Sequence, residues 1–304
     1  MIGLLSWLIR MARICFPGNS HRSLRFQARM VIAGLRQADL MRQFQTPQPG
    51  STVEKLVQDR PDILGALIWP YQCASWKVQE RLTRVLSHYA EIDRIGAPLV
   101  FRVEDKLVLQ DLDTLHEGMR IVMDQPQWFL REGGLTLNIF LGNFRCMSLA
   151  FSFFRTPEGR LQVFIGGVQG RNAEDALEIY RTLTKAMSGQ RPRDLLLEYL
   201  RFLCAHYDVQ DLFAVTDDHR HHRHPYFGQT EFPMNYDEIW LDRGGVREGS
   251  DHFRLPLQAP RRPISEIKPN KRSLYRRRYA LLDDLRASFG ASLSQAKLCQ
   301  FVDT

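Results

Sequence analysis

The chain has 304 residues, of which 44% are hydrophobic and 25% are charged, and these shares exclude a disordered, collagen-like or low-complexity protein. The formal net charge of +7 favours anionic partners, such as nucleic acid, lipid headgroups or phosphate-bearing cofactors. No run of about 20 apolar residues, the length that spans a bilayer, is present, and the five widely spaced cysteines indicate reduced thiols in the cytosol rather than a disulfide framework.

The first segment, residues 1–50, is predicted to form an amphipathic helical arm. Arg10 and Arg13 interrupt its apolar run, and no basic stretch precedes that run, so cleavage as a signal peptide is not expected. The helix either packs on the rest of the protein or docks on a partner, or it serves as a short anchor at a membrane surface. The apolar residues that can share one helical face are Ile2, Leu5, Leu8, Ile9 and Met11.

Residues 51–125 are predicted to form a mainly helical subdomain. Ser51 and Glu54 have the spacing of a capping box, which predicts a short helix that begins there. Apolar residues at steps of three and four predict a longer helix over residues 76–92. Strands are expected in this region only as a pair, at 99–103 and 107–109.

Residues 126–304 are predicted to form an α+β domain. From Leu135 onwards every second residue is a large apolar one, which is the pattern of β-strands. Gly142–Asn143 suits a two-residue hairpin turn. Asn172 can cap one crossover helix, and Pro192 suits the first turn of a second. The fold class is therefore α+β, with a helical N-terminal region packed on a mixed, largely antiparallel sheet. The expected strands are 135–141, 147–153, 161–166, 212–215, 238–241 and 253–257.

The chain closes with a basic helix whose apolar stripe includes Tyr275 and Tyr279. Because the tyrosines lie on that stripe, they favour core packing over base stacking, and nucleic acid is not an expected partner. The basic face is either solvated or in contact with an anionic membrane surface or an acidic partner. The cations of this region are Arg261, Arg262, Lys268, Lys271, Arg272, Arg276, Arg277 and Arg278.

Six blocks of sequence occur in a characteristic order along the chain. They are LTLNIFLGNFRCMSLAFSF (135–153), VFIGGVQGR (163–171), LTKAMSGQRPRDLLLEYLR (183–201), LFAVTDDH (212–219), NYDEIWLDRGG (235–245) and KRSLYRRRYALLDDL (271–285). Together they resemble the VirK/YbjX family, a bacterial group of unknown function linked to virulence and resistance to antimicrobial peptides. The resemblance implies a cytoplasmic protein of cell-envelope, virulence or peptide-modification pathways, with peripheral contact at the inner membrane as one extension. Its substrate is then a peptide, a protein or an envelope component.

The order of the expected strands and helices is also similar to the GNAT acyltransferase fold. That resemblance implies acyl-coenzyme A or another acyl donor as cofactor, bound by backbone groups of a strand and by the start of the helix that follows. The candidate binding residues between that strand and helix are Gly166, Gly167, Gly170 and Arg171. Arg191 belongs to a second basic turn. A tight turn and a solvated loop are the plainer interpretations of the two segments.

His219 is the main candidate for chemistry, because it follows the expected strand 212–215 and an imidazole titrates near neutral pH. It is expected to act as a general base, with Asp218 or Glu238 orienting it. A structural histidine is the alternative. The histidine-rich segment that follows also offers metal ligands, with His219 and His221 as secondary candidates, but no metal site is assigned.

These patterns favour two functions of different class. The first is an acyl- or group-transfer enzyme that acts on a peptide, protein or envelope substrate. The second is a non-catalytic adaptor or regulator that binds an anionic membrane or an acidic partner. A His-dependent metalloenzyme is a third hypothesis.

Overall fold

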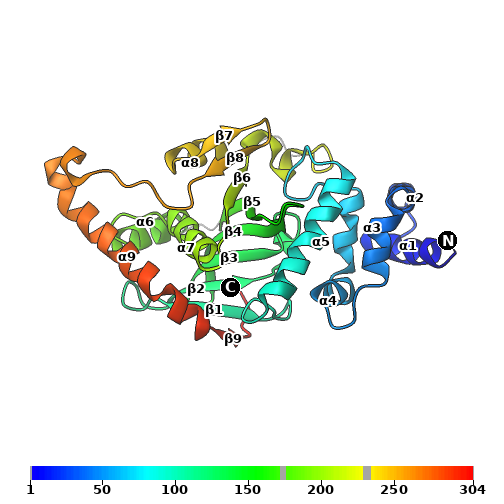
Figure 1. Ribbon diagram of the computed structural model, residues 1–304, viewed down its shortest axis with the longest axis horizontal. Helices are drawn as coiled ribbons and strands as arrows, with labels where there is room; N and C mark the ends of the chain where they lie inside the picture. The colour runs from blue at the N-terminus through cyan, green and yellow to red at the C-terminus, as the bar shows by residue number, and fades with distance from the viewer. Residues whose placement is uncertain (1, 172–175, 229–233, 304) are drawn as a thin grey trace.

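The N-terminal part of the protein is a stack of helices at one end of the molecule (Figure 1). The computed structural model describes residues 2–171, 176–228 and 234–303. Helix α1 packs against α2, and both contact the 3-10 helix η1, so that Leu8 and Met30 are fully buried. These elements are α1 (Ile2–Cys15), α2 (His21–Arg36), α3 (Ala38–Gln45), α4 (Thr52–Asp59), η1 (Pro61–Leu67) and α5 (Val78–Ile95).

A mixed sheet forms the centre of the molecule (Figure 1). Counted over the described residues, its nine strands have the order β7-β8-β6-β5-β4-β3-β2-β1-β9. Strands β5 and β6 are parallel, and all other neighbours are antiparallel, which confirms the predicted α+β class. The strands are β1 (Lys106–Asp111), β2 (Met119–Asp124), β3 (Leu135–Leu141), β4 (Phe144–Arg155), β5 (Leu161–Gly170), β6 (Asp211–Val215), β7 (Val246–Glu248), β8 (His252–Leu255) and β9 (Lys297–Cys299).

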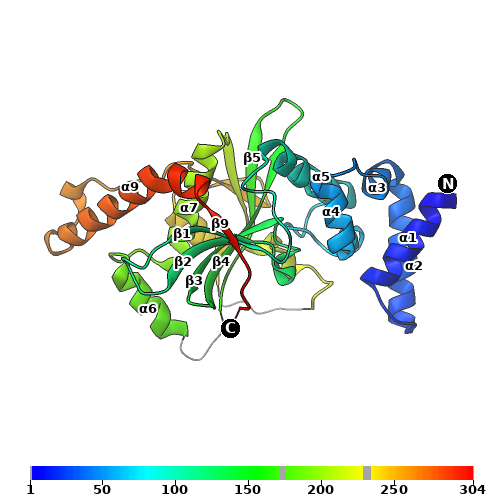
Figure 2. The same cartoon turned by 90° about the horizontal axis from the view of Figure 1, so that it is seen from below.

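Different helices cover the two faces of the sheet (Figures 1 and 2). Helix α5 contacts β4 from one side, and α7 contacts β3, β4 and β5 from the other, where α6 and α9 also pack. The central strands are therefore buried on both faces, and every residue from Leu135 to Phe140 is buried. The remaining helices are α6 (Ala176–Ala186), α7 (Pro192–His206), α8 (Tyr236–Asp242) and α9 (Arg272–Ser294).

Local sequence signals predicted several elements correctly. The Ser51 side chain accepts a hydrogen bond from the Glu54 backbone N–H and caps α4, as the capping-box spacing predicts. In the hairpin of β3 and β4, Gly142 and Asn143 form a two-residue turn between the paired residues Leu141 and Phe144. Helix α7 begins at Pro192, as expected. The predicted cap at Asn172 lies outside the described residues.

Other strand predictions were wrong. Residues 238–241 belong to α8, because the Asn235 side chain accepts a hydrogen bond from the Glu238 N–H and starts a helix there. Residues 99–103 form no strand, and β1 pairs instead with β2 and β9, neither of which was predicted. The third expected strand continues to Gly170. The division of the chain at residue 126 remains a prediction, although β1 and β2 precede it and belong to the same sheet.

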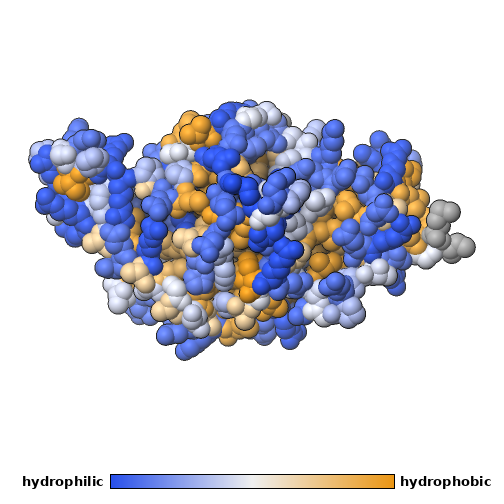
Figure 3. Space-filling model, viewed as in Figure 1, coloured by the Kyte–Doolittle hydropathy of each residue, from blue (hydrophilic) through white to orange (hydrophobic). Residues whose placement is uncertain are grey.

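The N-terminal helices leave apolar side chains on the surface (Figure 3). Trp7 and Phe16 are buried, so α1 packs on the rest of the protein, which was one of the interpretations that the sequence left open. Within the described residues, no helix combines the length and the hydropathy that a bilayer-spanning segment requires. The exposed apolar residues of α1 and α2 are Leu5, Ile9, Ile14, Leu24, Ile32 and Leu35.

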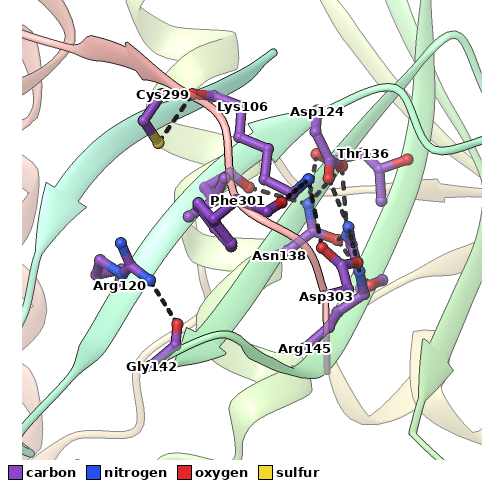
Figure 4. A network of polar contacts seen from close by, with 12 residues as sticks. Lys106, Arg120, Asp124, Thr136, Asn138, Gly142, Arg145, Cys299, Phe301 and Asp303 are labelled. Atoms are coloured by element: carbon purple, nitrogen blue, oxygen red, sulfur yellow. Dashed lines mark hydrogen bonds and ion pairs between the residues drawn. The ribbon is translucent and has the colours of Figure 1, made fainter. Parts of the chain in front are cut away.

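A buried ion-pair network joins the C-terminal residues to the sheet (Figure 4). The Arg145 guanidinium on β4 lies 2.6 Å from the carboxylates of both Asp124 on β2 and Asp303. It also donates to the Asn138 side-chain oxygen on β3. Lys106 on β1 binds Asp303 at 3.3 Å. Because Arg145 and Asp124 are almost completely buried, each charge depends on the other for compensation.

Replacing Arg145 by Met is expected to lower the free energy of unfolding by about 3–5 kcal/mol, because it leaves the buried Asp124 carboxylate without its cation. Urea denaturation measures this change. Arg42→Met is the matched control, since Arg42 pairs with an exposed Asp39 and its loss should cost about 1 kcal/mol or less. Similar costs for the two substitutions would contradict the network's role.

Candidate functional site

Glu132 is a buried carboxylate that lies against β5 on the α5 side of the sheet. It is 1% exposed, and it precedes β3 by a short glycine turn. The Gln169 side-chain amide of β5 donates to Glu132 Oε1. The Gln72 side chain donates to the Glu132 backbone oxygen at 3.2 Å. Among the described residues, no group forms a hydrogen bond with Glu132 Oε2.

Two glycines of β5 provide the space for Glu132. A Cβ atom built on Gly167 would lie 1.5 Å from Glu132 Oε2, and one on Gly166 would lie 2.0 Å from the Glu132 backbone oxygen. Neither position accepts a larger residue without movement of the Glu132 segment. The absence of side chains at Gly166 and Gly167 therefore makes room for the Glu132 side chain and backbone. The phosphate binding expected at these glycines remains a prediction.

Two histidines lie beside this carboxylate. His221 and His222 belong to the 3-10 helix η4 (His221–Arg223), and their rings are 3.7 Å apart. His221 Nε2 lies 4.0 Å from Glu132 Oε1. One potential ligand atom from each of Glu132, His221 and His222 lies within 4.8 Å of the other two, a donor set suited to a metal ion. We call these three residues the Glu132 cluster.

Burial and nearby charge control the protonation of the Glu132 cluster. Burial raises the pKa of Glu132 well above its usual range, against the opposing effects of the Gln169 hydrogen bond and the Arg220 charge. Burial lowers the pKa of His221 well below its usual range and that of His222 to about 4. The charges of Arg131 and Arg220 add to both decreases. Both imidazoles are therefore neutral at neutral pH.

The predicted catalytic residues are not assembled around His219. His219 is half-buried, and its Nδ1 lies 3.0 Å from Thr216 Oγ1. Asp218 is exposed, and the Glu238 carboxylate accepts a hydrogen bond from its own capping residue, Asn235. Among the described residues, neither carboxylate contacts the His219 ring. The roles expected for His219, Asp218 and Glu238 remain predictions.

Asp217 has a structural role that the sequence did not suggest. Its Oδ1 accepts a hydrogen bond from the Tyr236 N–H at 3.0 Å, at the start of α8. Its Oδ2 pairs with Arg223, and its own N–H donates to Asp237 at 2.7 Å. Asp217 thus fixes the segment before α8, and its carboxylate faces arginine rather than the neighbouring histidines.

At its C-terminal end, β5 extends beyond its parallel neighbour β6, and a tyrosine side chain binds its backbone there. Parallel pairing of β5 with β6 ends at Ile165 and Ala214, and β5 continues beyond it. There the Tyr236 hydroxyl of α8 accepts a hydrogen bond from the Val168 N–H at 2.9 Å and donates one to the Val168 backbone oxygen at 3.0 Å. In the GNAT comparison such strand groups bind the acyl donor, whereas here they are occupied by a side chain of the protein. Arg171, which follows β5, is exposed.

The other face of β5 borders a large pocket between α6, α7 and α9. Its volume is about 800 Å³. A Cβ atom on Gly170 would lie 2.6 Å from Tyr180 Oη and 3.3 Å from Met147 Cε, and both residues line the pocket. Arg191 lines it as well, at the start of α7. We call this cavity the α6–α9 pocket. Arg191 thus lines the pocket, and Gly170 lies behind two of its lining side chains, apart from Gly166 and Gly167.

The cysteines offer no nucleophile. All five are free, and burial raises the pKa of the Cys73 thiol to about 11 and that of Cys146 to about 12. Thiols with such a high pKa carry almost no thiolate at neutral pH. Cys73, Cys146 and Cys204 are buried.

Glu132, His222 and Gln169 are the site residues that the sequence analysis missed. Glu132 stands directly before Gly133–Gly134 and a buried strand, and this unusual context was the available signal. His222 was part of the histidine-rich segment, but nothing local indicated that it would turn inward with His221.

A family model and individual relatives both match this chain over most of its length. Residues 18–291 match the family described as protein of unknown function DUF535. The chain is 28% identical over 298 residues to the uncharacterized protein YbjX of Escherichia coli strain K12. This alignment covers 93% of this chain and 88% of YbjX. It is 27% identical over 214 residues to an uncharacterized protein of Haemophilus influenzae, with 69% and 70% covered. These names state no activity.

Replacing Gly167 by Ala is expected to lower the free energy of unfolding by about 1–3 kcal/mol, because the new Cβ overlaps Glu132 Oε2. In a Glu132→Ala background the same replacement should cost clearly less. A double-mutant cycle by urea denaturation measures this coupling. Gly290→Ala, which meets no atom closer than 3.8 Å, is the control and should be neutral or stabilising. An undiminished cost of Gly167→Ala in the Glu132→Ala background would show that the two residues do not touch.

Proposed function

This chain belongs to the DUF535 family, the VirK/YbjX group of unknown function, and from that premise we propose that it binds an anionic acyl amphiphile in the α6–α9 pocket. The shared chemistry of such molecules is an apolar chain joined to phosphate, as in acyl-coenzyme A or a phospholipid. In this proposal the bound molecule is the donor or the substrate of a group transfer, and the second reactant is a peptide, a protein or an envelope component.

The lining of the α6–α9 pocket is the observation that carries the proposal. Met147, Leu177 and Leu274 supply apolar surface, and no carboxylate is among the lining residues in the described ranges. An acyl chain gains about 0.8 kcal/mol for each CH₂ group that it buries. Phosphate binds well to cationic side chains, arginine above all. The cations that line the pocket are Arg181, Lys185, Arg191, Arg193 and Arg277.

Most of these cations are available to a ligand. Arg193 pairs with Asp194 at 3.1 Å, but none of the other four forms an ion pair with a carboxylate in the part of the chain that the structure describes. Arg191 also precedes Pro192 at the start of the 15-residue helix α7. Unpaired backbone N–H groups at a helix start add to the attraction for an anion.

The walls of the pocket are held in place from within the protein. Arg278 of α9 donates to the backbone oxygens of Ser188 and Gly189, at 3.1 and 2.8 Å. These bonds tie α9 to the turn between α6 and α7. The pocket is therefore part of the folded structure, with its apolar and cationic sides at a set distance.

Neutralising the pocket is expected to weaken binding of decanoyl-coenzyme A. Arg191→Gln and Arg277→Gln should each raise the Kd about tenfold, since a hydrogen bond to a charged group contributes about 1.5 kcal/mol or more. Isothermal titration calorimetry measures the Kd. Arg286→Gln, on the exposed face of α9 and away from the pocket, is the matched control and should leave it unchanged.

Three further ligands separate the alternatives. Coenzyme A without a chain and decanoate without phosphate should both bind more weakly than decanoyl-coenzyme A. Dihexanoyl phosphatidylglycerol distinguishes a phospholipid from an acyl-coenzyme A, and release of the coenzyme A thiol reports transfer. Equal binding to wild type and to the Arg191→Gln, Arg277→Gln double variant would contradict the proposed site.

Docking on an anionic membrane is a second candidate function, favoured by the charge distribution of α1 and α2. The first 36 residues contain no Asp or Glu, and the six arginines among them are exposed. They accompany the exposed apolar residues of the same two helices. An arginine near an anionic bilayer contributes about 1 kcal/mol. The arginines are Arg10, Arg13, Arg22, Arg25, Arg29 and Arg36.

Replacing Arg22, Arg25 and Arg29 by Gln is expected to abolish co-flotation with phosphatidylglycerol vesicles, because it removes half of the arginines of this hairpin. Binding of the wild type should also fall with added salt and be absent with phosphatidylcholine alone. A variant with Arg262, Arg276 and Arg286 changed to Gln is the charge-matched control at the opposite end of the molecule (Figure 1). Loss of flotation only in that control would assign membrane contact to α9 instead.

A further inference from the structure

The Glu132 cluster contains buried polar atoms that have no hydrogen-bond partner in the part of the chain that the structure describes. These atoms are Glu132 Oε2 and His221 Nδ1, and both are inaccessible to water. Their side chains are 1% and 4% exposed. A buried polar group without a partner costs about 1–3 kcal/mol. Two such groups in one cluster therefore point to a bound species, such as an ion, that supplies the missing contacts.

The surrounding structure holds these atoms close together. Gly166 and Gly167 let Glu132 lie against β5, and Gln169 orients its carboxylate from the next position on the same face. On the other side, the Phe227 ring packs edge-on against His221, with centroids 5.4 Å apart. Hydrogen bonds that orient a ligating carboxylate and apolar contacts that orient imidazoles are typical supports of metal sites.

The distances are compatible with one ion after a small adjustment. Two ligand atoms at about 2.1 Å from the same ion lie at most about 4.2 Å apart. The separation of 4.0 Å between His221 Nε2 and Glu132 Oε1 meets this limit. The 4.8 Å span of the whole cluster exceeds it slightly. A shift of about 0.6 Å in one ligand atom would bring the span within this limit.

Two cations near the cluster limit its affinity. Arg131 stacks over Trp69 and Phe227, at 4.6 and 5.2 Å from the ring centroids. Arg220 lies near enough to Glu132 and to both histidines to affect their protonation. Their repulsion of a cation is opposed by one ligand that becomes anionic on losing its proton, Glu132, and its raised pKa adds to the cost of binding. The affinity should therefore be lower than that of a structural zinc site with several thiolate ligands.

We infer that Glu132, His221 and His222 form a binding site for one divalent first-row transition-metal ion. Two imidazoles and one carboxylate are the ligand set of Fe²⁺ and Zn²⁺ sites that keep open coordination positions. If the carboxylate chelated the ion through both oxygens, Oε2 of Glu132 would gain a partner as well. This site lies on the α5 side of β5 and is independent of the proposed amphiphile pocket on the other side.

Metal binding to the untagged protein, first dialysed against a chelator, tests the inference. Zn²⁺, Co²⁺ and, without oxygen, Fe²⁺ are added, and bound metal is measured by elemental analysis and by Co²⁺ visible absorption. One equivalent is expected. Even the loss of an outer-shell partner costs 10- to 100-fold in affinity, so Glu132→Gln and His222→Asn should each raise the Kd by about a hundredfold.

His219→Asn and His224→Asn are the matched controls from the same histidine-rich segment, and both should bind as the wild type does. Because Glu132 is fully buried, circular dichroism checks that its variant folds, and the half-exposed His222 gives a second variant with less risk to the fold. No stoichiometric metal in the wild type would overturn the inference. An equal loss in His224→Asn would also overturn it, since it would indicate binding to a flexible histidine tract.

Discussion

The central strands of the sheet are buried on both faces, so every polar side chain that points from them must find a partner inside the protein. On the α5 side, Asn138, Ser148 and Gln169 are neighbours across β3, β4 and β5. Asn138 joins the Arg145 network at one end of this row, and Gln169 joins Glu132 at the other. The ion-pair network and the Glu132 cluster are thus two ends of one buried polar layer, and the arrangement of both follows from the same lack of water.

Strand β5 places the two candidate sites back to back. Gln169 points to the Glu132 cluster, and Gly170 backs on the side chains that line the α6–α9 pocket. Arg220 connects the two regions, since its charge acts on Glu132 and its guanidinium donates to the backbone oxygen of Met234, which lines the pocket. The two candidate sites share no lining residue, so each can be altered and assayed without removing the other.

Sequence reasoning succeeded where the deciding contact is local. The cap at Ser51, the turn at Gly142 and the start of α7 depend on neighbouring residues alone. It failed where distant segments decide. Residues 238–241 were expected to form a strand, but Trp240 is buried and donates a hydrogen bond to the Val215 backbone oxygen of β6, and the segment is helical. The Asn235 cap of this helix was a local signal that the sequence analysis missed.

The candidate site shows the same limit. The sequence analysis proposed that the glycines of β5 bind a phosphate, which remains a prediction, and it did not foresee that Glu132, from a separate part of the chain, lies against two of them. The position of His219 after β6 was predicted from strand-end reasoning, whereas two successive 3-10 turns bring His221 into the interior instead. The family itself was recognisable from short blocks because these blocks form β3 to β6, α7 and α9, the elements that build the sheet and its cover.

The last strand has a consequence for synthesis. Strand β1 is made early, but one of its two edges pairs with β9, and the residue that ties this end to β4 is Asp303. On the ribosome, one edge of β1 stays open until residues 297–299 have emerged, and Arg145 lacks one of its two carboxylates until Asp303 has emerged. Open strand edges pair readily with other chains. Rapid completion of the chain is therefore itself a protection against aggregation for this protein.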